Sequence, residues 1–428
     1  DGSNWTDNTN WVSDESFNNW FGLTATEGRV TTLDLPANNI SGDLPAEVGE
    51  LRFLQNIDIS DNDISGTFDQ FLDVTTLVNV NLNNNSISGS IPVPIGGATG
   101  TQTLRVRNNA LSGTLPAAMG NLTGLTVLDL SGNDITGSIP NAFNGLTNLD
   151  TLNLSNNNLS AKIPGALGSL TNLRYMDLSF NALPDTVPSA FKNLSNITEI
   201  RLNNNQLSGE VPSDLTDLST LDRLYLNSNQ LVDLPNLSSM TWISQFDVSD
   251  NLLTFEDLEP NVGITGFTYS PQDSVGQEEN MVVSLGGTLE LEVSVAGGSN
   301  TYQWYKDGEA ITGQTSNTLS IGNVSADDAG VYHCAISNSV ATDLTIYSQP
   351  ANVEVYATSY TLSNSFSFPE KGSPNDYTPN DYRLIGLPGN GNTALNSIFT
   401  GEAGSDWVAY WDNGDPSTDP NVYLDEFD

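Results

Sequence analysis

Four arginines and three aromatic residues are the side chains of this sequence best suited to binding a ligand. They are Arg105, Arg107, Tyr175, Phe180, Arg201, Arg223 and Tyr225. Paired guanidinium groups hold a carboxylate or sulfate through parallel hydrogen bonds, and aromatic rings stack on a sugar or a peptide. The sequence has 12 basic and 52 acidic residues, so four arginines on one surface would be a local exception to its charge of -40. We predict that these seven residues form a ligand-binding site.

A repeated pattern places these residues. Between Val30 and Leu253 the sequence apolar-x-apolar-x-x-Asn-x-apolar recurs at steps of 22 to 24 residues. Its asparagines are Asn38, Asn62, Asn85, Asn109, Asn133, Asn157, Asn181, Asn205, Asn229 and Asn251. This period lies in the range of leucine-rich repeats, in which each unit is a short strand plus a return segment that only neighbouring units can bury. The pattern predicts a solenoid with a parallel β-sheet along its concave face.

One unit explains the strict spacing. Leu152 and Leu154 alternate inward from the strand and stack on the same leucines of the next coil. Asn157 then turns inward, where its amide can satisfy buried backbone groups and form a ladder with the other asparagines. We expect the Ser-Gly and Ile-Pro pairs that follow, as at residues 138–140, to form turns that stop helix propagation. The seven candidate residues occupy solvent-directed positions of such strands and their ends.

The repeat units resemble the plant-type subfamily of leucine-rich repeats. Residues 111–122 (LSGTLPAAMGNL) are close to a copy of that subfamily's tail, and Trp11, residues 20–23 and residues 28–35 resemble its N-terminal cap. The cap lacks the cysteine pair of the plant proteins. This departure favours a bacterial secreted relative, and we interpret Asp1 as a position midway through the cap. Residues 357–428 resemble the β-rich tails that follow such arrays in large secreted proteins of the Bacteroidetes, and the acidic charge agrees with a marine setting.

The candidate arginines also carry a resemblance. Arg105-Val-Arg107 is similar to the R-x-R element by which plant peptide-hormone receptors hold the C-terminal carboxylate of a ligand. The alternative is that the arginines only offset nearby carboxylates of the same sheet, because exposed charge pairs are common and contribute little. Those carboxylates are Asp34, Asp58, Asp129 and Asp177.

The repeats give way to a second pattern near residue 275. Ile264, Phe267 and Tyr269 keep the strand spacing, with Gln272 in place of the asparagine and Phe255 and Leu258 packed beneath, which predicts a terminal half-coil. Beyond it, residues 289–295 alternate as a half-buried strand, and residues 301–308 (TYQWYKDG) supply a core tryptophan and a hairpin turn.

The motif Asp328-Ala-Gly-Val-Tyr-His-Cys334 is typical of immunoglobulin-like domains. Tyr332 is its corner tyrosine, and Val293 stands where such domains place the partner of Cys334, so we expect a buried, inert thiol. His333 is the one histidine of the sequence and lies on the opposite side of the strand from Tyr332. No nucleophile or further histidine accompanies it, so catalysis, a metal centre and a cofactor are not expected.

The predicted fold is thus an α/β-type solenoid followed by an all-β immunoglobulin-like sandwich and a β-rich C-terminal segment. We divide the chain into an N-terminal cap (1–29), the solenoid with its half-coil cap (30–275), the immunoglobulin-like domain (276–356) and a β-rich segment that the chain end interrupts (357–428). In the last segment, 382–388 and 406–412 are predicted strands, and the acidic turn at 412–419 is interpreted as a turn rather than a Ca²⁺ site.

Charge and hydropathy restrict the partners. A charge of -40 opposes binding to nucleic acid, and no apolar run approaches the ~18 residues that a membrane helix needs. We expect a secreted or cell-surface recognition and adhesion protein that binds an extracellular protein, a peptide or an acidic polysaccharide on the concave face. The alternatives are a structural stalk or surface-layer component, and an inhibitor of a polysaccharide-degrading enzyme.

Overall fold

The computed structural model describes residues 4–71 and 75–356. Its contacts divide the chain into two compact units. Among the described residues, the first unit consists of those up to Gly276 with 294–303 and 334–348, and the second consists of 277–293, 304–333 and 349–356. The strands predicted at 382–388 and 406–412 and the acidic turn at 412–419 lie outside the described residues.

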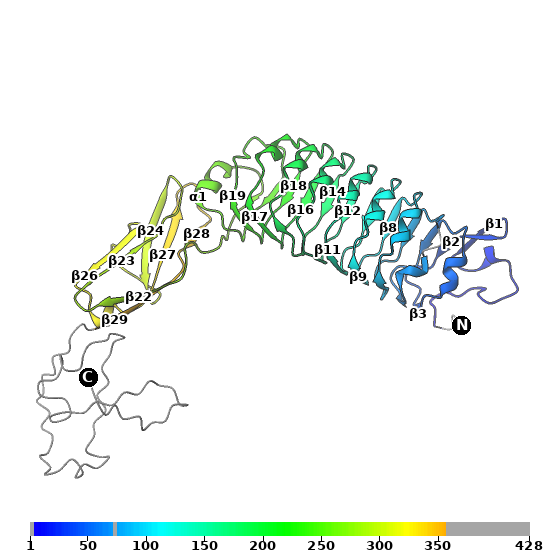
Figure 1. Cartoon of the computed structure of the whole chain (residues 1–428), viewed down its shortest axis with the longest axis horizontal. Coiled ribbons are helices and arrows are strands. Elements are labelled where there is room, and N and C mark those ends of the chain that lie inside the picture. Colours follow the sequence, from blue (N-terminus) through cyan, green and yellow to red (C-terminus); the bar gives the residue numbers. More distant parts are fainter. Residues whose placement is uncertain (1–3, 72–74, 357–428) are drawn as a thin grey trace, which may run out of the picture. The chain divides into compact units, whose positions relative to one another are not determined.

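The predicted solenoid is confirmed, and its strands form one long sheet (Figure 1). The sheet has 12 strands: β1 (Leu23–Thr26), β2 (Arg29–Asp34), β4 (Asn56–Asp58), β6 (Asn79–Asn81), β8 (Thr103–Arg105), β10 (Val127–Asp129), β12 (Thr151–Asn153), β14 (Tyr175–Asp177), β16 (Glu199–Arg201), β18 (Arg223–Tyr225), β20 (Gln245–Asp247) and β21 (Phe267–Thr268). β1 pairs with β2 in antiparallel fashion, whereas the following strands are parallel. The register repeats from coil to coil, so that Leu128 lies opposite Leu104 on one side and Leu152 on the other.

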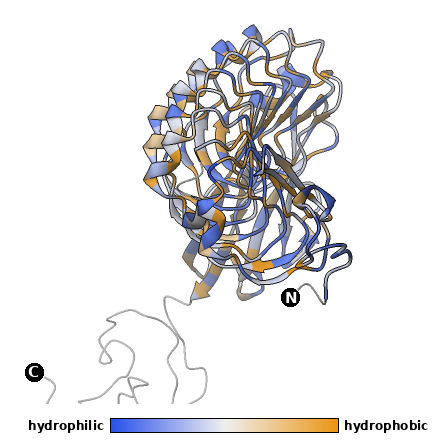
Figure 2. Cartoon of the chain, turned by 90° about the vertical axis from the view of Figure 1, so that its right-hand side faces the viewer, coloured by the Kyte–Doolittle hydropathy of each residue, from blue (hydrophilic) through white to orange (hydrophobic). Residues whose placement is uncertain are grey.

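The predicted asparagine ladder is also present. The Oδ1 atom of Asn157 accepts a hydrogen bond of 3.0 Å from the backbone N–H of Ile135. Its Nδ2 donates to the carbonyl oxygens of Leu130 (3.0 Å), Leu154 (3.2 Å) and Ser155 (3.2 Å). One side chain therefore satisfies backbone groups of its own coil and of the coil before it, which fixes the distance between coils. Figure 2 shows apolar and polar segments recurring at the same places in successive coils.

The return segments differ from the prediction. The Ser-Gly regions, expected to be turns, are extended and pair in parallel with the neighbouring coil. The physical reason is that every coil presents the same extended segment at the same height, so the backbone groups of neighbouring coils can pair. These strands are β3 (Ser41–Asp43), β5 (Asp63–Ser65), β7 (Ser88–Ser90), β9 (Ala110–Thr114), β11 (Asp134–Gly137), β13 (Asn158–Leu159), β15 (Pro184–Asp185), β17 (Gln206–Glu210) and β19 (Gln230–Asp233).

The prolines also act differently from the expectation. Pro140 and Pro164 each stand directly before a short 3-10 helix, where their fixed φ suits a helix start and the missing N–H costs nothing. The 3-10 helices of the solenoid unit are η1 (Phe17–Asn19), η2 (Ala46–Glu50), η3 (Phe68–Phe71), η4 (Val93–Gly97), η5 (Ala117–Asn121), η6 (Asn141–Gly145), η7 (Gly165–Ser169), η8 (Ser189–Asn193), η9 (Ser213–Asp217) and η10 (Glu259–Asn261). Each is about one turn long, so a coil stays short enough to repeat every 22 to 24 residues.

Both ends of the solenoid are covered. At the C-terminal end, Gln272 takes the asparagine's place as predicted: its Oε1 accepts from Leu253 N (3.1 Å) and its Nε2 donates to Val248 O (2.9 Å). Phe255 and Leu258, the first and last residues of helix α1 (Phe255–Leu258), are fully buried. At the N-terminal end, three indole rings form a chain, in which Trp11 lies 4.9 Å from Trp5 and 5.1 Å from Trp20 between ring centroids.

The immunoglobulin-like region is a β-sandwich, as predicted. Its elements are β22 (Glu279–Ser284), β23 (Thr288–Glu292), β24 (Asn300–Lys306), β25 (Glu309–Ala310), β26 (Thr318–Gly322), η11 (Ala326–Asp328), β27 (Gly330–Asn338), β28 (Thr345–Tyr347) and β29 (Ala351–Tyr356). The hydroxyl of Tyr332 donates a 2.6 Å hydrogen bond to the carbonyl oxygen of Asp328, which confirms the corner tyrosine. Trp304, Val293 and Cys334 are buried, and burial raises the pKa of the Cys334 thiol to about 11.

Candidate ligand-binding face

The solvent-facing side of the 12-stranded sheet, here called the concave face, carries two columns of side chains that flank the buried middle residue of each strand. Column 1 consists of Thr32, Asn56, Asn79, Thr103, Val127, Thr151, Tyr175, Glu199, Arg223 and Gln245. Column 2 consists of Asp34, Asp58, Asn81, Arg105, Asp129, Asn153, Asp177, Arg201, Tyr225 and Asp247. Five of the seven predicted site residues belong to these columns.

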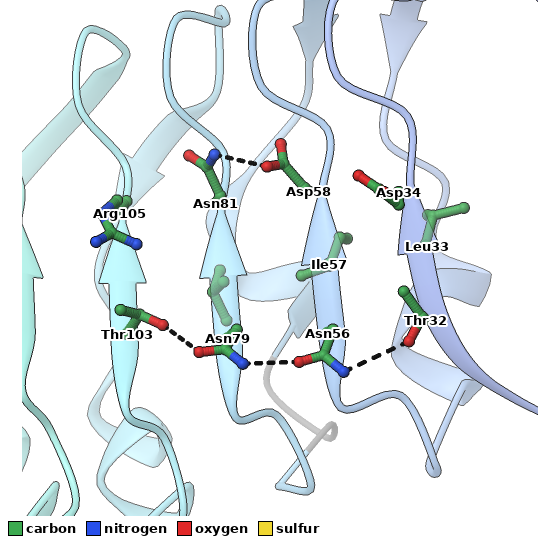
Figure 3. Close-up of a pocket in the computed structure, with 11 residues that line it drawn as sticks. Thr32, Leu33, Asp34, Asn56, Ile57, Asp58, Asn79, Asn81, Thr103 and Arg105 are labelled. Atoms are coloured by element: carbon green, nitrogen blue, oxygen red, sulfur yellow. Dashed lines mark hydrogen bonds between the residues drawn. The ribbon is translucent and has the colours of Figure 1, made fainter. Parts of the chain in front are cut away.

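The N-terminal part of the concave face is a polar hollow of about 300 Å³ (Figure 3). In column 1 the side chains link across the strands: Asn56 donates to Thr32 (3.4 Å), Asn79 donates to Asn56 (2.8 Å), and the hydroxyl of Thr103 donates to Asn79. These bonds fix the direction of each amide. The hollow therefore has a rigid wall of hydrogen-bonding groups.

Arg105 lies at the edge of this hollow. Its column neighbours are Asn81 and Asp129, and the Asp129 carboxylate already accepts the hydroxyl of Ser131 at 2.6 Å. Arg107 follows two residues later and is exposed, while Val106 between them is fully buried. Within residues 4–71 and 75–356, neither guanidinium has a carboxylate in ion-pair range. Two cations without an ion-pair partner among the described residues thus lie two residues apart, at the end of β8 and just beyond it.

Arg201 and Arg223 have a different environment, because an internal carboxylate lies between them. Glu199 lies between them with only 4% of its surface exposed. One of its oxygens accepts from Nε of Arg201, and the other lies 2.9 Å from Nη2 of Arg223. Burial opposes the charge of Arg201, but the hydrogen bond and charge of Glu199 outweigh it and raise the pKa of Arg201. The chain itself therefore supplies the carboxylate that a ligand was expected to provide.

Within the described structure, the arginines do not form ion pairs with the carboxylates that the sequence suggested as their alternative partners. Arg223 has Asp222 as its second anion, with 3.6 Å between Nε and Oδ2. Asp34, Asp58, Asp129 and Asp177 form no ion pair with an arginine among the described residues. The reason is the register of the strands. Glu199, which contacts both arginines, stands two positions before Arg201 on β16 and directly opposite Arg223 on β18.

Two tyrosines border the arginine pair. The Cζ atom of Arg201 lies 4.9 Å from the centre of the Tyr225 ring. The hydroxyl of Tyr175 donates a 3.0 Å hydrogen bond to Asp177 Oδ2, and burial together with that carboxylate raises the pKa of Tyr175. Asp177 is itself buried and binds Ser179 through Oδ1 at 2.6 Å. We call Tyr175, Glu199, Arg201, Arg223 and Tyr225 the platform.

Phe180 follows the strand of Tyr175 and is 50% exposed. Its φ is 54°, in the left-handed region that bulky residues rarely adopt. In other coils this position holds small or amide side chains, such as Asn108 (φ 52°), Asn156 (φ 53°) and Asn204 (φ 55°). A large ring at this position costs conformational energy, because the left-handed region suits glycine and asparagine better than bulky residues.

Sequence reasoning missed Glu199, although a signal was available. Glu199 precedes Arg201 by two residues and Arg223 by 24. Period two puts it on the same side of the strand as Arg201, and the repeat length puts it beside Arg223 in the next coil.

His333 lies on β27 of the immunoglobulin-like region. Its ring stacks on Tyr305 with 5.0 Å between centroids and an interplanar angle of 3°. Among the described residues, no group of three or more histidine, cysteine or acidic side chains is placed to hold a metal ion. No helix in the described part of the chain combines the length and apolar character needed to span a bilayer.

Comparison with known proteins agrees with the two folds. Leucine-rich-repeat models match residues 76–98, 99–159, 135–183 and 171–231, and an immunoglobulin-domain model matches residues 271–338. The receptor-like kinase TMK4 of Arabidopsis thaliana is 31% identical over 81 residues, which are 19% of this chain and 9% of that protein.

Solved structures extend the likeness. The ectodomain of the receptor kinase GASSHO1/SCHENGEN3 from Arabidopsis thaliana, in complex with CASPARIAN STRIP INTEGRITY FACTOR 2, is 29% identical with a TM-score of 0.58, covering 61% of this chain and 33% of that one. The Arabidopsis receptor kinase HAESA, in complex with the peptide hormone IDA and the co-receptor SERK1, is 29% identical with a TM-score of 0.53, covering 64% and 46%. The chain spans less than half the length of each of these three proteins.

The chain therefore combines leucine-rich repeats, similar to those of plant receptor ectodomains, with an immunoglobulin-like domain. The repeats form an extended concave face, and columns 1 and 2 supply the polar, charged and aromatic side chains of that face.

Proposed function

We propose that this protein is an extracellular recognition protein whose concave face binds an extended peptide, with the peptide's C-terminal carboxylate held by Arg105 and Arg107. The observation that carries the proposal is the contrast between the two arginine pairs. Arg201 and Arg223 share Glu199, whereas Arg105 and Arg107 have no carboxylate partner in the described structure. A pair of free guanidiniums is suited to one carboxylate, which it can hold through several charge-assisted hydrogen bonds.

The distribution of charge favours a peptide over an acidic polysaccharide. A polyanion that followed the sheet would bring a negative group to every few strands. Column 2 would meet it with Asp34, Asp58, Asp129, Asp177 and Asp247. Like charges opposed across an interface lower affinity strongly. A ligand with a single terminal carboxylate avoids this repulsion.

The spacing of the strands favours an extended ligand. Neighbouring strands lie about 4.8 Å apart, so the four strand steps from Arg105 to Arg201 span roughly 19 Å, the length of about six extended residues. The complex of HAESA with the peptide hormone IDA supports the choice of ligand class. The similarity to receptor ectodomains supports a secreted or cell-surface location. We propose binding without catalysis.

The test uses an array of ten-residue peptides, each made with a free and with an amidated C-terminus. Binding to free-acid peptides should fall at least about tenfold on amidation, and equally in the double variant Arg105→Gln/Arg107→Gln, because each change removes one side of the same charged contact. The matched control is Arg52→Gln/Lys162→Gln, which removes two exposed positive charges outside the concave columns.

Binding should also weaken with added NaCl. Equal binding of free and amidated peptides, or a double variant that behaves like the control, would contradict the proposal. Preferential binding of an acidic polysaccharide such as polygalacturonate would replace the peptide by a glycan.

A further inference from the structure

We infer that Glu199 closes the Arg201–Arg223 pair to anions, so that the platform accepts a neutral planar side chain of the ligand, such as an aromatic ring. The inference deepens the proposed function and rests on it for the nature of the ligand. It assigns Glu199 a positioning role and divides the concave face into an anion subsite at Arg105 and Arg107 and a neutral subsite at the platform.

The first argument is occupancy. Both oxygens of Glu199 are in use, one by Nε of Arg201 and one by Nη2 of Arg223. The side chain is 5% exposed, whereas those of Arg201 and Arg223 are 40% and 42% exposed. The carboxylate therefore lies beneath the two guanidiniums, which cover it from solvent. A ligand anion cannot replace it without leaving a buried charge unpaired, which is costly.

The second argument is local charge. Besides Glu199, Asp222 lies 3.6 Å from Nε of Arg223, and the buried Asp177 is the column neighbour of Arg201. Glu199 and Asp222 thus offset the two guanidiniums, and Asp177, which forms no ion pair in the described structure, adds a further negative charge on the neighbouring strand. An incoming carboxylate or sulfate meets these negative charges here, whereas Arg107 is exposed and has no carboxylate in ion-pair range among the described residues.

The third argument is shape. The guanidinium of Arg201 is bound by Glu199 through Nε, and its Cζ lies over the Tyr225 ring, 4.9 Å from the ring centre. Tyr175 lies one strand away, with its hydroxyl fixed on Asp177 at 3.0 Å. Fixed planar groups favour stacking, and a guanidinium plane and a tyrosine ring both stack on aromatic side chains.

The first experiment asks whether the guanidiniums are open to anions, and it uses sulfate as the probe. Titration with sodium sulfate against sodium chloride at equal ionic strength should show at least about tenfold tighter sulfate binding by Glu199→Gln than by wild type, because the freed guanidiniums then lack a counter-charge. The gain should disappear in the triple variant Glu199→Gln/Arg201→Gln/Arg223→Gln.

The matched control is Asp214→Asn. It also removes one carboxylate from an ion pair, with Lys192 at 2.8 Å, but outside the columns of the concave face. It should bind sulfate as wild type does. Wild-type sulfate binding that is lost in Arg201→Gln/Arg223→Gln would overturn the inference.

A second measurement needs no change at Glu199, in case that variant does not fold. Phenylglyoxal modifies accessible guanidiniums, and mass spectrometry of the wild-type protein gives the rate at each arginine. Arg105 and Arg107 should react several times faster than Arg201 and Arg223, because ion pairing hinders the reagent. Equal rates at the four arginines would contradict the closed state of the pair.

The third experiment asks what the platform accepts. The probes are ten-residue peptides with a free C-terminus that carry tyrosine or glutamate six residues before the end. Wild type should prefer tyrosine at least about tenfold, and Glu199→Gln should reduce this preference to about threefold or less. A wild-type preference for glutamate would overturn the inference. A failure of the proposed function would give a different result: C-terminal amidation would leave the affinity of every peptide unchanged. In that case the sulfate titration would still test the role of Glu199.

Discussion

Arg201 and Tyr225 are direct neighbours in column 2, and the Cζ atom of Arg201 lies 4.9 Å from the centre of the Tyr225 ring. Other side chains fix the positions of both Arg201 and Tyr225. Glu199 binds the guanidinium, and the tyrosine hydroxyl donates to Oε1 of Gln245. Because the geometry exists before any ligand arrives, binding there requires little ordering of side chains.

The first prediction concerns this ring. Tyr225→Ala should weaken binding of tyrosine-containing test peptides by about twofold to tenfold, since it removes an aromatic stacking contact with the ligand that contributes about 0.5–1.5 kcal/mol. Tyr225→Phe keeps the ring without the hydroxyl and should bind nearly as wild type does. Calorimetric titration of the three proteins checks this. Wild-type affinity in Tyr225→Ala would remove the ring from the binding site.

Phe180 gives a second prediction, in which stability and binding change in opposite directions. Phe180→Asn should raise the free energy of unfolding by about 1 kcal/mol, because asparagine tolerates the left-handed φ of 54° better than a bulky ring does. The same variant should lose affinity for the test peptides. Phe180→Leu is the control, since it retains an apolar side chain without any advantage at positive φ. Thermal unfolding and peptide titration are the measurements, and a destabilised Phe180→Asn would show that the ring serves the fold.

The asparagine ladder yields a third prediction. Asn157→Ala should lower the free energy of unfolding by about 1–3 kcal/mol, because it leaves the buried backbone N–H of Ile135 without its acceptor and removes one hydrogen bond each from the carbonyl oxygens of Leu130 and Leu154. Asn158→Ala changes the adjacent, exposed asparagine and should have little effect. Urea denaturation of both variants measures the difference. Similar losses in the two would contradict the ladder's contribution to stability.

The fourth prediction concerns Cys334 and pH. Its thiol has an ordinary pKa of 9.0 and a raised pKa of about 11 in the folded protein, because burial disfavours the thiolate. The stability that the neutral thiol contributes is fully present below pH 9 and is lost as pH rises toward 11. The difference in unfolding free energy between wild type and Cys334→Ala should therefore shrink over this interval.

Alkylation provides an independent measurement of the same thiol. Iodoacetamide should label Cys334 slowly in the native protein at pH 8 and rapidly after denaturation, because the side chain is fully buried and its thiolate is scarce. Rapid native labelling would contradict its place in the core. The sequence contains no second cysteine, so reductant should leave the unfolding midpoint unchanged.

The sequence by itself determined the solenoid and the positions on its face. A repeat of 22 to 24 residues with inward leucines and an inward asparagine permits one coil geometry, since Asn157 can satisfy Leu130 and Ile135 only when coils stack at a fixed distance. The alternation of strand residues then identified Arg105, Arg201 and Tyr225 as side chains of the concave face. The corner tyrosine Tyr332 followed equally from a local motif.

Only the tertiary structure decided which of these residues remain open to a ligand. The repeat spacing placed Glu199 beside Arg201 and Arg223, but pairing also depends on side-chain conformation and burial, so the structure was needed to show that Glu199 engages both arginines while Arg105 has no such partner among the described residues. The second set of strands likewise required the stacked coils, because a Ser-Gly segment pairs only when the next coil presents its own backbone beside it. The repeat placed the charges on the concave face, and the contacts between coils determined which of them are neutralised.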